Sequence, residues 1–411
     1  MAQFPRLRLR DPAIDLVDLP WELQLREWPS DTLAFRFIPV GPSRHLVRFL
    51  VSNGVLYALK ELPLDAARRE YDVLLHLEGL GLPTVEVAGI AEAPARTSGI
   101  LVTKFLPHSL QYRRLMMRLP AGPGPHRDRL LDAMAFLLVD LHRSGVFWGD
   151  CSLANTLFRR DGDRIQAYLV DAETGELHGA LSDGQRAYDL EIAHVNIIGE
   201  LLDVDAEVGL PPDLDPEETG EEVVRRYEDL WRELTHEETF AADERFKVEE
   251  RLERLNDLGF DVEEVQLVAT PGGYRLRLDP HVVEPGHHRH RLLRLTGLDA
   301  QENQARRMLN DIARFREALE RQQKRPLSES VVASRWRQEV FEPTVAAVPA
   351  ELQSRLPGAE VFHQVLEHRW FLSEQEGKDV GIDEAVRSYV EKELPKHAPE
   401  RVLLDTDPAD Y

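Results

Sequence analysis

The stretch LHRSGVFWGDCSLANTLFRRDGDRIQAYLVDAETGE, Leu141 to Glu176, decides the fold. It holds two apolar, strand-like pieces, and each ends on or beside an aspartate, Asp150 or Asp171. Acids at the ends of buried strands are either caps for backbone groups or ligands for something charged. Asn155 follows Asp150 by five residues, and the intervening FRRDGDRIQAYLV is typical of a hairpin that returns Asp171 alongside. Two carboxylates and an amide are hard oxygen ligands of the kind that suit Mg²⁺.

The composition is that of a globular protein. The chain has 411 residues, 43% hydrophobic and 30% charged, which is enough for two or three domains. Its formal net charge of −23 opposes general binding to nucleic acid or anionic membranes. The one cysteine, Cys151, excludes an intrachain disulfide and suits a reducing compartment. The N-terminus has no apolar core of signal-peptide length, and no run in the sequence approaches the roughly 18 apolar residues of a membrane span. We therefore expect a soluble, cytoplasmic protein.

The first half of the chain changes from strands to helices. Past an extension at the N-terminus, β-rich runs are separated by short turns, among them Ser52-Asn53-Gly54. Next come a helix that stops at glycine and proline, a further strand pair, and a long amphipathic helix. The expected strands span 33–40, 45–53, 55–62, 85–93 and 98–106, and the expected helices span 65–83 and 126–145.

The second half is acidic at first and then mostly helical. An acidic, proline-containing connection past Ala206 predicts a domain boundary, and 262–280 is typical of a β-hairpin around Pro271-Gly272-Gly273. We expect an α+β protein with two lobes that bind nucleotide, a small antiparallel sheet lobe and a helical lobe, followed by a mostly α-helical C-terminal domain with a β-hairpin. The expected domains are an N-terminal extension (1–30), the first lobe (31–103), the second lobe (104–205) and the C-terminal domain (206–411).

The segments GDCSLAN and LVDAE resemble the catalytic motifs of the protein-kinase-like superfamily. That family has an aspartate, an asparagine five positions on, and a metal-binding aspartate that ends a strand. The preceding LHRSG is similar to the LHxxG of aminoglycoside-kinase-like, lipopolysaccharide-core-kinase-like and RIO-type atypical kinases, and Ser152 matches the serine usual in the RIO type. The resemblance implies a protein-kinase-like fold that binds ATP, with Asp150 as the catalytic aspartate and with Asn155 and Asp171 as ligands of Mg²⁺.

The resemblance also implies a lysine on a strand and a glutamate on the next helix. VLYALKEL supplies Lys60, which matches the family's V-A-I-K, and Glu70 follows ten residues later. Lys60 would contact the nucleotide phosphates, with Glu70 orienting it. The alternative is a surface lysine and a solvated glutamate.

Two features depart from the family pattern. Trp148 stands where a histidine is expected, and Asp171-Ala172-Glu173 replaces Asp-Phe-Gly. Glu173 is either a further metal or substrate contact or a solvated turn residue. The glycine-rich lid is reduced to VGPSRH, with the single glycine Gly41 and a proline that lacks an N–H. Here Ser43, Arg44 and His45 are candidate phosphate ligands, and a simple turn is the alternative.

Two further segments match the family. GILVTKFLPHSL resembles the hinge between the lobes, where backbone groups near Lys104 and Leu106 would contact adenine. Asp189 in RAYDLEIA matches the helix aspartate that braces the catalytic loop, which is a structural role.

The C-terminal half offers less chemistry. His287, His288 and His290 fit no common zinc spacing, and we expect an exposed loop there. A nearby arginine cluster either binds a phosphorylated substrate or RNA or neutralises the acidic segment 213–264; it comprises Arg289, Arg291, Arg294, Arg306 and Arg307. This half resembles the uncharacterised domain that accompanies some bacterial lipopolysaccharide-kinase-like proteins.

These observations favour an ATP- and Mg²⁺-dependent phosphotransferase. Its partners would be the nucleotide and a hydroxyl acceptor on a sugar, a lipid-linked molecule or a protein. The alternative is a pseudokinase scaffold that binds nucleotide, or nothing, and acts on a protein partner through its C-terminal domain.

Overall fold

The computed structural model describes most of the chain. The described residues are 6–10, 13–38, 44–92, 97–112, 115, 124–162, 164–235, 238–241, 265–270, 273–278, 286–353, 355–376 and 380–396. Two predicted phosphate contacts, Gly41 and Ser43, lie outside them.

The first lobe is built on a six-stranded sheet with the strand order β1-β5-β6-β4-β3-β2, in which all neighbours are antiparallel. The turn between β3 and β4 has positive φ at Asn53 and Gly54, as the sequence pattern predicts for a two-residue hairpin. β4 lies between β3 and β6, so both of its edges are paired. The strands are β1 (Arg6–Leu9), β2 (Phe35–Arg36), β3 (Leu46–Ser52), β4 (Val55–Pro63), β5 (Val87–Glu92) and β6 (Ser98–Lys104).

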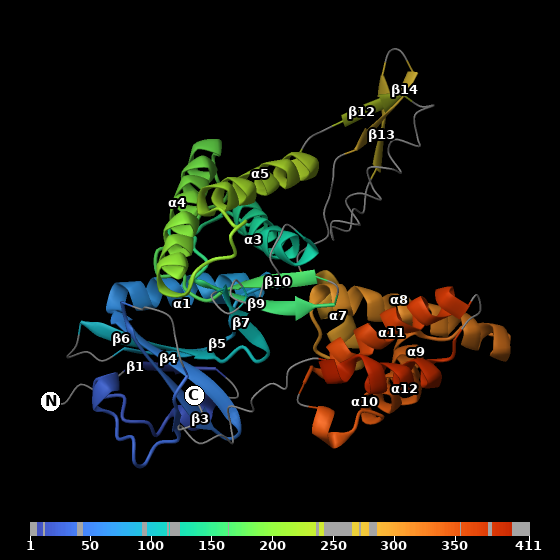
Figure 1. Ribbon diagram of the computed structural model, residues 1–411, viewed down its shortest axis with the longest axis horizontal. Helices are drawn as coiled ribbons and strands as arrows, with labels where there is room; N and C mark the ends of the chain where they lie inside the picture. The colour runs from blue at the N-terminus through green and yellow to red at the C-terminus, as the bar shows by residue number, and fades with distance from the viewer. Residues whose placement is uncertain are drawn as a thin grey trace.

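The two faces of this sheet are covered by different segments. Alternate residues point to opposite faces of a strand, so Ile90 and Leu101 pack under helix α1 (Leu64–Gly79). Their neighbours Ala91 and Ile100 pack against the N-terminal segment. Figure 1 shows α1 between the sheet and the helices of the second lobe.

The segment expected as an N-terminal extension is packed onto the first lobe. β1 pairs with β5, and the rings of Trp21 and Trp28 are buried at a centroid distance of 5.1 Å. The same segment contains two short 3₁₀ turns, η1 (Ala13–Leu16) and η2 (Leu25–Glu27). We therefore propose that residues 6–30 belong to the first lobe.

The second lobe is mainly helical. Its core contains α3 (Pro125–Arg143), α4 (Asp183–Val208) and α5 (Pro216–Thr235), and the buried Tyr227 and Leu230 of α5 belong to the same apolar cluster as α1 and α3. The predicted boundary at residue 206 thus falls within the last turn of α4, ahead of the packed helix α5, and we propose the boundary after Thr235 instead. Small strands complete the lobe: β7 (Ser109–Gln111), β8 (Val146–Phe147), β9 (Thr156–Asp161), β10 (Arg164–Leu169) and β11 (Glu176–Leu177).

The C-terminal region is mostly helical and carries the expected hairpin, as β13 and β14, with β12 as a third strand. The aromatic rings of Trp336, Phe341 and Phe362 meet in its core. The histidine-rich stretch expected as a loop forms the first turn of α7, so that prediction is wrong. The elements are β12 (Glu238–Ala241), β13 (Val265–Thr270), β14 (Gly273–Leu278), α7 (His287–Thr296), α8 (Glu302–Gln323), α9 (Glu329–Trp336), η3 (Arg337–Phe341), α10 (Glu342–Ala346), η4 (Ala350–Leu352), α11 (Gly358–Glu376), α12 (Ile382–Lys392) and η5 (Leu394–Lys396).

The arginine cluster of this region is largely paired within it. Ion pairs join Arg289 to Asp299, Arg291 to Glu329, and Arg307 to Glu367. Among the described residues, no helix is both long and apolar enough to cross a membrane.

Candidate active site

The β9–β10 hairpin brings Asn155 and Asp171 to one end. Thr156 pairs with Leu169 at its open end, and the Val170 N–H donates to the Asn155 carbonyl at 3.1 Å. Asn155 therefore lies just before the first strand and Asp171 just after the second, as the sequence predicts.

Lys60 and Glu70 meet because both face the interior between β4 and α1. In β4, Lys60 has the same orientation as the buried Leu62, two residues on. Glu70 belongs to the buried stripe of α1 and is 1% exposed. Lys60 Nζ donates to Glu70 Oε2 at 2.9 Å and to Asp171 Oδ2 at 2.6 Å. The strand lysine, the helix glutamate and the second aspartate therefore form one group.

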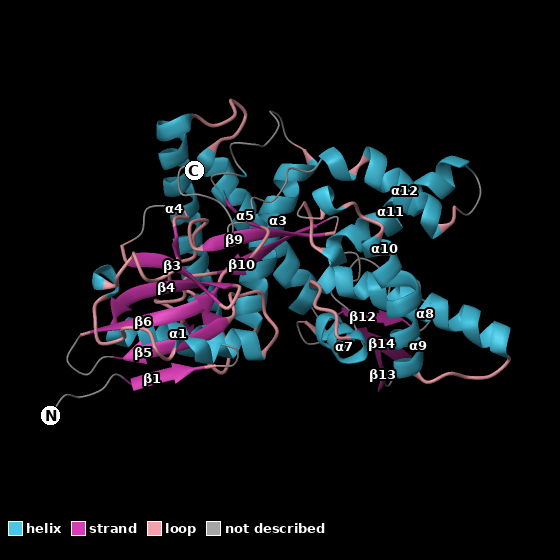
Figure 2. Ribbon diagram, turned by 90° about the horizontal axis from the view of Figure 1, so that it is seen from below, coloured by secondary structure: helices cyan, strands magenta, loops and turns pink. Residues whose placement is uncertain are grey.

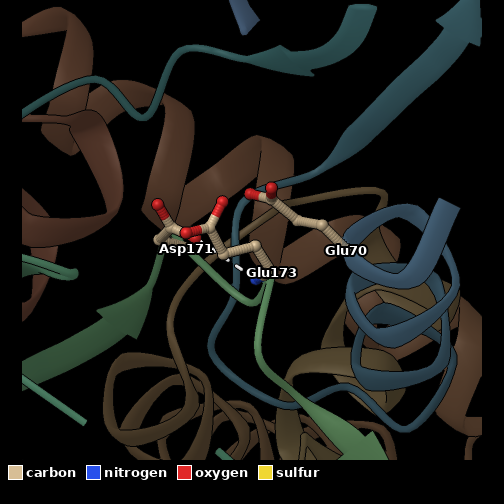
Figure 3. A group of neighbouring side chains, drawn as sticks. All are labelled: Glu70, Asp171 and Glu173. Atoms are coloured by element: carbon tan, nitrogen blue, oxygen red, sulfur yellow. Dashed lines mark hydrogen bonds between the residues drawn. The ribbon is translucent and has the colours of Figure 1, made fainter. Parts of the chain in front are cut away.

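Three carboxylates gather around this single ammonium. Figure 3 shows Glu70, Asp171 and Glu173 directed towards one another, and their ligand oxygens lie within 4.8 Å of each other. Burial and the Asp171 carboxylate raise the pKa of Glu70. Burial alone would lower the pKa of Lys60, but the Glu70 and Asp171 carboxylates raise it. The cluster holds more negative than positive charge, and its hard oxygen donors fit a divalent cation such as Mg²⁺.

Two residues of the lid segment lie over the acids. His45 Nε2 is 2.7 Å from Glu173 Oε2. The Arg44 guanidinium is 3.3 Å from Asp150 Oδ2 and 3.5 Å from Glu173 Oε1. Arg44 is mostly exposed, with 76% of its side chain accessible, so its contacts are easily exchanged for those of an incoming anion.

Asp150 is held by two amide side chains. Asn155 Nδ2 donates to the Asp150 carbonyl at 3.0 Å and to its Oδ2 at 3.2 Å, and Asn196 Nδ2 donates to Oδ1 at 3.0 Å. The Asp150 side chain remains 31% exposed. An oriented and accessible carboxylate is what the positioning of an acceptor hydroxyl requires.

A buried aspartate braces the loop before Asp150. Asp189 accepts hydrogen bonds from the N–H groups of Trp148 at 2.7 Å and Gly149 at 2.8 Å. The ring of His142 lies 3.1 Å from the same carboxylate. The Trp148 indole N–H donates to the Asp171 carbonyl at 3.0 Å, so the residue that replaces the expected histidine joins the two acidic loops.

Sequence reasoning missed two residues that hold the loop, Asn196 and Glu200. The carboxylate of Glu200 accepts the N–H groups of Leu153 at 2.7 Å and Ala154 at 3.0 Å. Asp189, Asn196 and Glu200 are spaced by seven and four residues along α4, which places them on one helix face. That spacing of polar residues was the signal available in the sequence.

At the predicted hinge, the backbone is partly in use. The Lys104 N–H donates to the Glu86 carbonyl at 2.8 Å, and its ammonium is paired with the Glu86 carboxylate. The Leu106 carbonyl accepts a hydrogen bond from Ser109 Oγ at 2.8 Å.

The sheet lobe, the lysine–glutamate pair and the two acidic loops together define a protein-kinase-like domain. Residues 52–196, which include the lysine–glutamate pair and both acidic loops, match the lipopolysaccharide kinase (Kdo/WaaP) family. The chain is 26% identical over 139 residues to the lipopolysaccharide core heptose(I) kinase WaaP of Pseudomonas aeruginosa, over 32% of this chain and 52% of that protein. It thus spans about half the length of the curated relative that it matches.

Two further similarities cover more of the chain. A solved structure of WaaP in complex with acyl carrier protein shares 20% sequence identity, with a TM-score of 0.38 over 62% of this chain and 99% of that one. Residues 229–394 match a domain of unknown function, DUF4032. The family matches confirm the resemblance to lipopolysaccharide-core-kinase-like proteins with an uncharacterised C-terminal domain.

Proposed function

We propose that the chain is a kinase-type phosphotransferase that transfers the terminal phosphoryl group of ATP, with Mg²⁺, to a hydroxyl acceptor. One observation carries the proposal: Lys60 Nζ lies 2.9 Å from Glu70 and 2.6 Å from Asp171. Phosphoryl transfer requires a cation on the phosphates, a held metal and a group that orients the acceptor. Lys60, Asp171 and Asp150 are suited to these three tasks.

Asp171, Asn155 and Glu173 are the residues that would hold Mg²⁺. Their oxygens suit a hard cation, and the excess of carboxylates over ammonium groups at the cluster favours one. The bound ion would neutralise charge on the phosphates. Lys60 would orient the phosphates, with Glu70 fixing its position. Arg44 would add positive charge from the lid, and His45 would add a further phosphate contact.

The nucleotide base would lie against the segment after β6. Because the Lys104 N–H is bonded to Glu86, we assign the adenine contact to Leu106. For the acceptor we favour a sugar hydroxyl, because the matched family and relative are lipopolysaccharide kinases. Lipid-linked and protein hydroxyls are the other classes to test. We propose that the reaction takes place in the cytoplasm, where ATP is available.

The test is transfer from ATP labelled in its terminal phosphate, with sugar, lipid-linked and protein acceptors, with and without Mg²⁺. We expect metal-dependent transfer that Asp150→Ala abolishes. The control Asp183→Ala changes an exposed acid on α4 and should retain it. If the wild-type chain binds ATP but transfers no phosphoryl group to any acceptor, the pseudokinase-scaffold hypothesis replaces the phosphotransferase proposal.

A further inference from the structure

The closed end of the β9–β10 hairpin is buried in the C-terminal domain. Asp161, at the end of β9, is 4% exposed. Its Oδ2 accepts the Asn303 N–H and its Oδ1 accepts the Gln304 N–H, both at 3.0 Å. These are the second and third residues of α8, whose first-turn N–H groups have no partner within the helix. Asp161 therefore caps a helix of the C-terminal domain from the kinase-like part of the chain.

The next residue fills a space that only glycine fits. The Gly162 N–H donates to Glu360 Oε2 at 2.9 Å, and Glu360 is 1% exposed. Gly162 has a φ of +68°, and a Cβ added there would lie 2.2 Å from Nε2 of the buried His363. Asp161 and Gly162 thus lie between α8 and α11, and both views show the hairpin reaching from the second lobe towards these helices (Figure 1, Figure 2).

The same hairpin carries Asn155 and Asp171 at its other end. Six residue pairs connect the two ends without a shift in register. At a rise of about 3.3 Å per residue, the enclosed turn and the acidic loops are about 20 Å apart. A paired ladder is stiff along its length, so the position of the turn restricts the positions of both loop residues.

We infer that the C-terminal domain acts on the active site by binding the closed end of this hairpin. Asp161 and Gly162 are then positioning residues for the metal ligands Asn155 and Asp171. The inference rests on the proposed function. The inference assigns a function to the domain that matches DUF4032, residues 229–394. The residues that contact the turn all belong to this range: Asn303, Gln304, Glu360 and His363.

The experiment measures how much Mg²⁺ tightens ATP binding, by calorimetric titration of the full chain with and without the metal. Gly162→Ala should force the turn out of its space, and Asp161→Ala should remove the cap. In both variants, the factor by which Mg²⁺ tightens ATP binding should fall about tenfold or more. This is the range of effects when residues that hydrogen-bond to metal ligands are replaced. Metal-free ATP binding should be unchanged, because Lys60 lies on a different sheet. A general loss of stability would weaken both kinds of binding alike.

The matched control is Gly54→Ala in the β3–β4 turn. Gly54 has a similar φ of +76°, but an added Cβ would have nothing within 4 Å, so this variant brings the backbone strain without the clash. If Gly162→Ala fails to fold, Asp161→Ala decides, because alanine is compatible with a strand end. If Mg²⁺ tightens ATP binding as much in both hairpin variants as in the wild type, the inference is overturned and the proposed function stands. An equal loss in Gly54→Ala also overturns it. No enhancement in the wild type contradicts the proposed function and the inference together.

Discussion

Lys60 Nζ lies 2.6 Å from Asp171 Oδ2, which joins the central strand of the first lobe to the loop after β10 in the second. The two residues are 111 positions apart in the sequence. Nucleotide phosphates would enter between them, so the ammonium would turn from the carboxylate to the phosphates when ATP binds.

Replacing Lys60 by methionine should weaken ATP binding. The side chain keeps its length and loses the charge, and a charge-assisted bond of this kind contributes about 1.5–3 kcal/mol, or about 10–100-fold in Kd. The free energy of unfolding should also fall, because Glu70 loses its buried partner. Titration calorimetry measures the first effect. The control Lys396→Met removes an exposed lysine paired with Glu393 and should change nothing. Unchanged affinity in Lys60→Met would contradict the assigned role.

Asp189→Asn should loosen the loop that carries Asp150. An amide offers one acceptor oxygen to the Trp148 and Gly149 N–H groups, where the carboxylate offers two. We expect a loss of about 2–3 kcal/mol in urea unfolding. Transfer should slow on the order of 10–100-fold because Asp150 is displaced. Asp183→Asn, on the same helix but exposed, is the matched control. Full activity in a destabilised Asp189→Asn variant would show that the brace is structural only.

Glu200 predicts a pH dependence of stability. Burial raises its pKa from 4.5 to about 7, although the Ala154 and Leu153 N–H groups oppose the shift. The folded protein therefore holds a proton that the unfolded chain releases between these values, and the free energy of unfolding falls as pH rises through this window. Compared with Glu200→Gln, the wild type should lose about 1–3 kcal/mol between about pH 5 and about pH 8 in urea unfolding. Parallel pH curves for the two proteins would contradict the burial of this carboxyl.

Local patterns in the sequence were sufficient for strands β2 to β6, for helices α1 and α3 and for the order of the motifs. Lys60 could be assigned because VLYALKEL matches the family's V-A-I-K, and Glu70 because it follows ten residues later on the next helix. Asn155 and Asp171 could be expected together because a short hairpin separates them. Each of these assignments depends on residues close together in the sequence or on the order of motifs along the chain.

Contacts between distant segments were not predictable in this way. Asp161 has the sequence context of an ordinary turn residue, and its partners on α8 lie more than 140 positions away. The acidic connection past residue 206 suggested a boundary, yet α5 supplies apolar residues to the second lobe. His287, His288 and His290 were expected in an exposed loop because they fit no common zinc spacing, yet helix α7 begins at His287 and buries Leu292 and Thr296. Such placements depend on tertiary packing.

The most direct test of the central claim is calorimetric titration of ATP, with and without Mg²⁺, into the wild-type chain and Asp171→Asn. We predict that Mg²⁺ tightens ATP binding about tenfold or more in the wild type. It should have little effect in the variant, which lacks the Asp171 carboxylate proposed to bind the metal. Metal-free binding should persist in both, through Lys60. Failure of the wild type to bind ATP, or an equal effect of Mg²⁺ in the two proteins, would contradict the account.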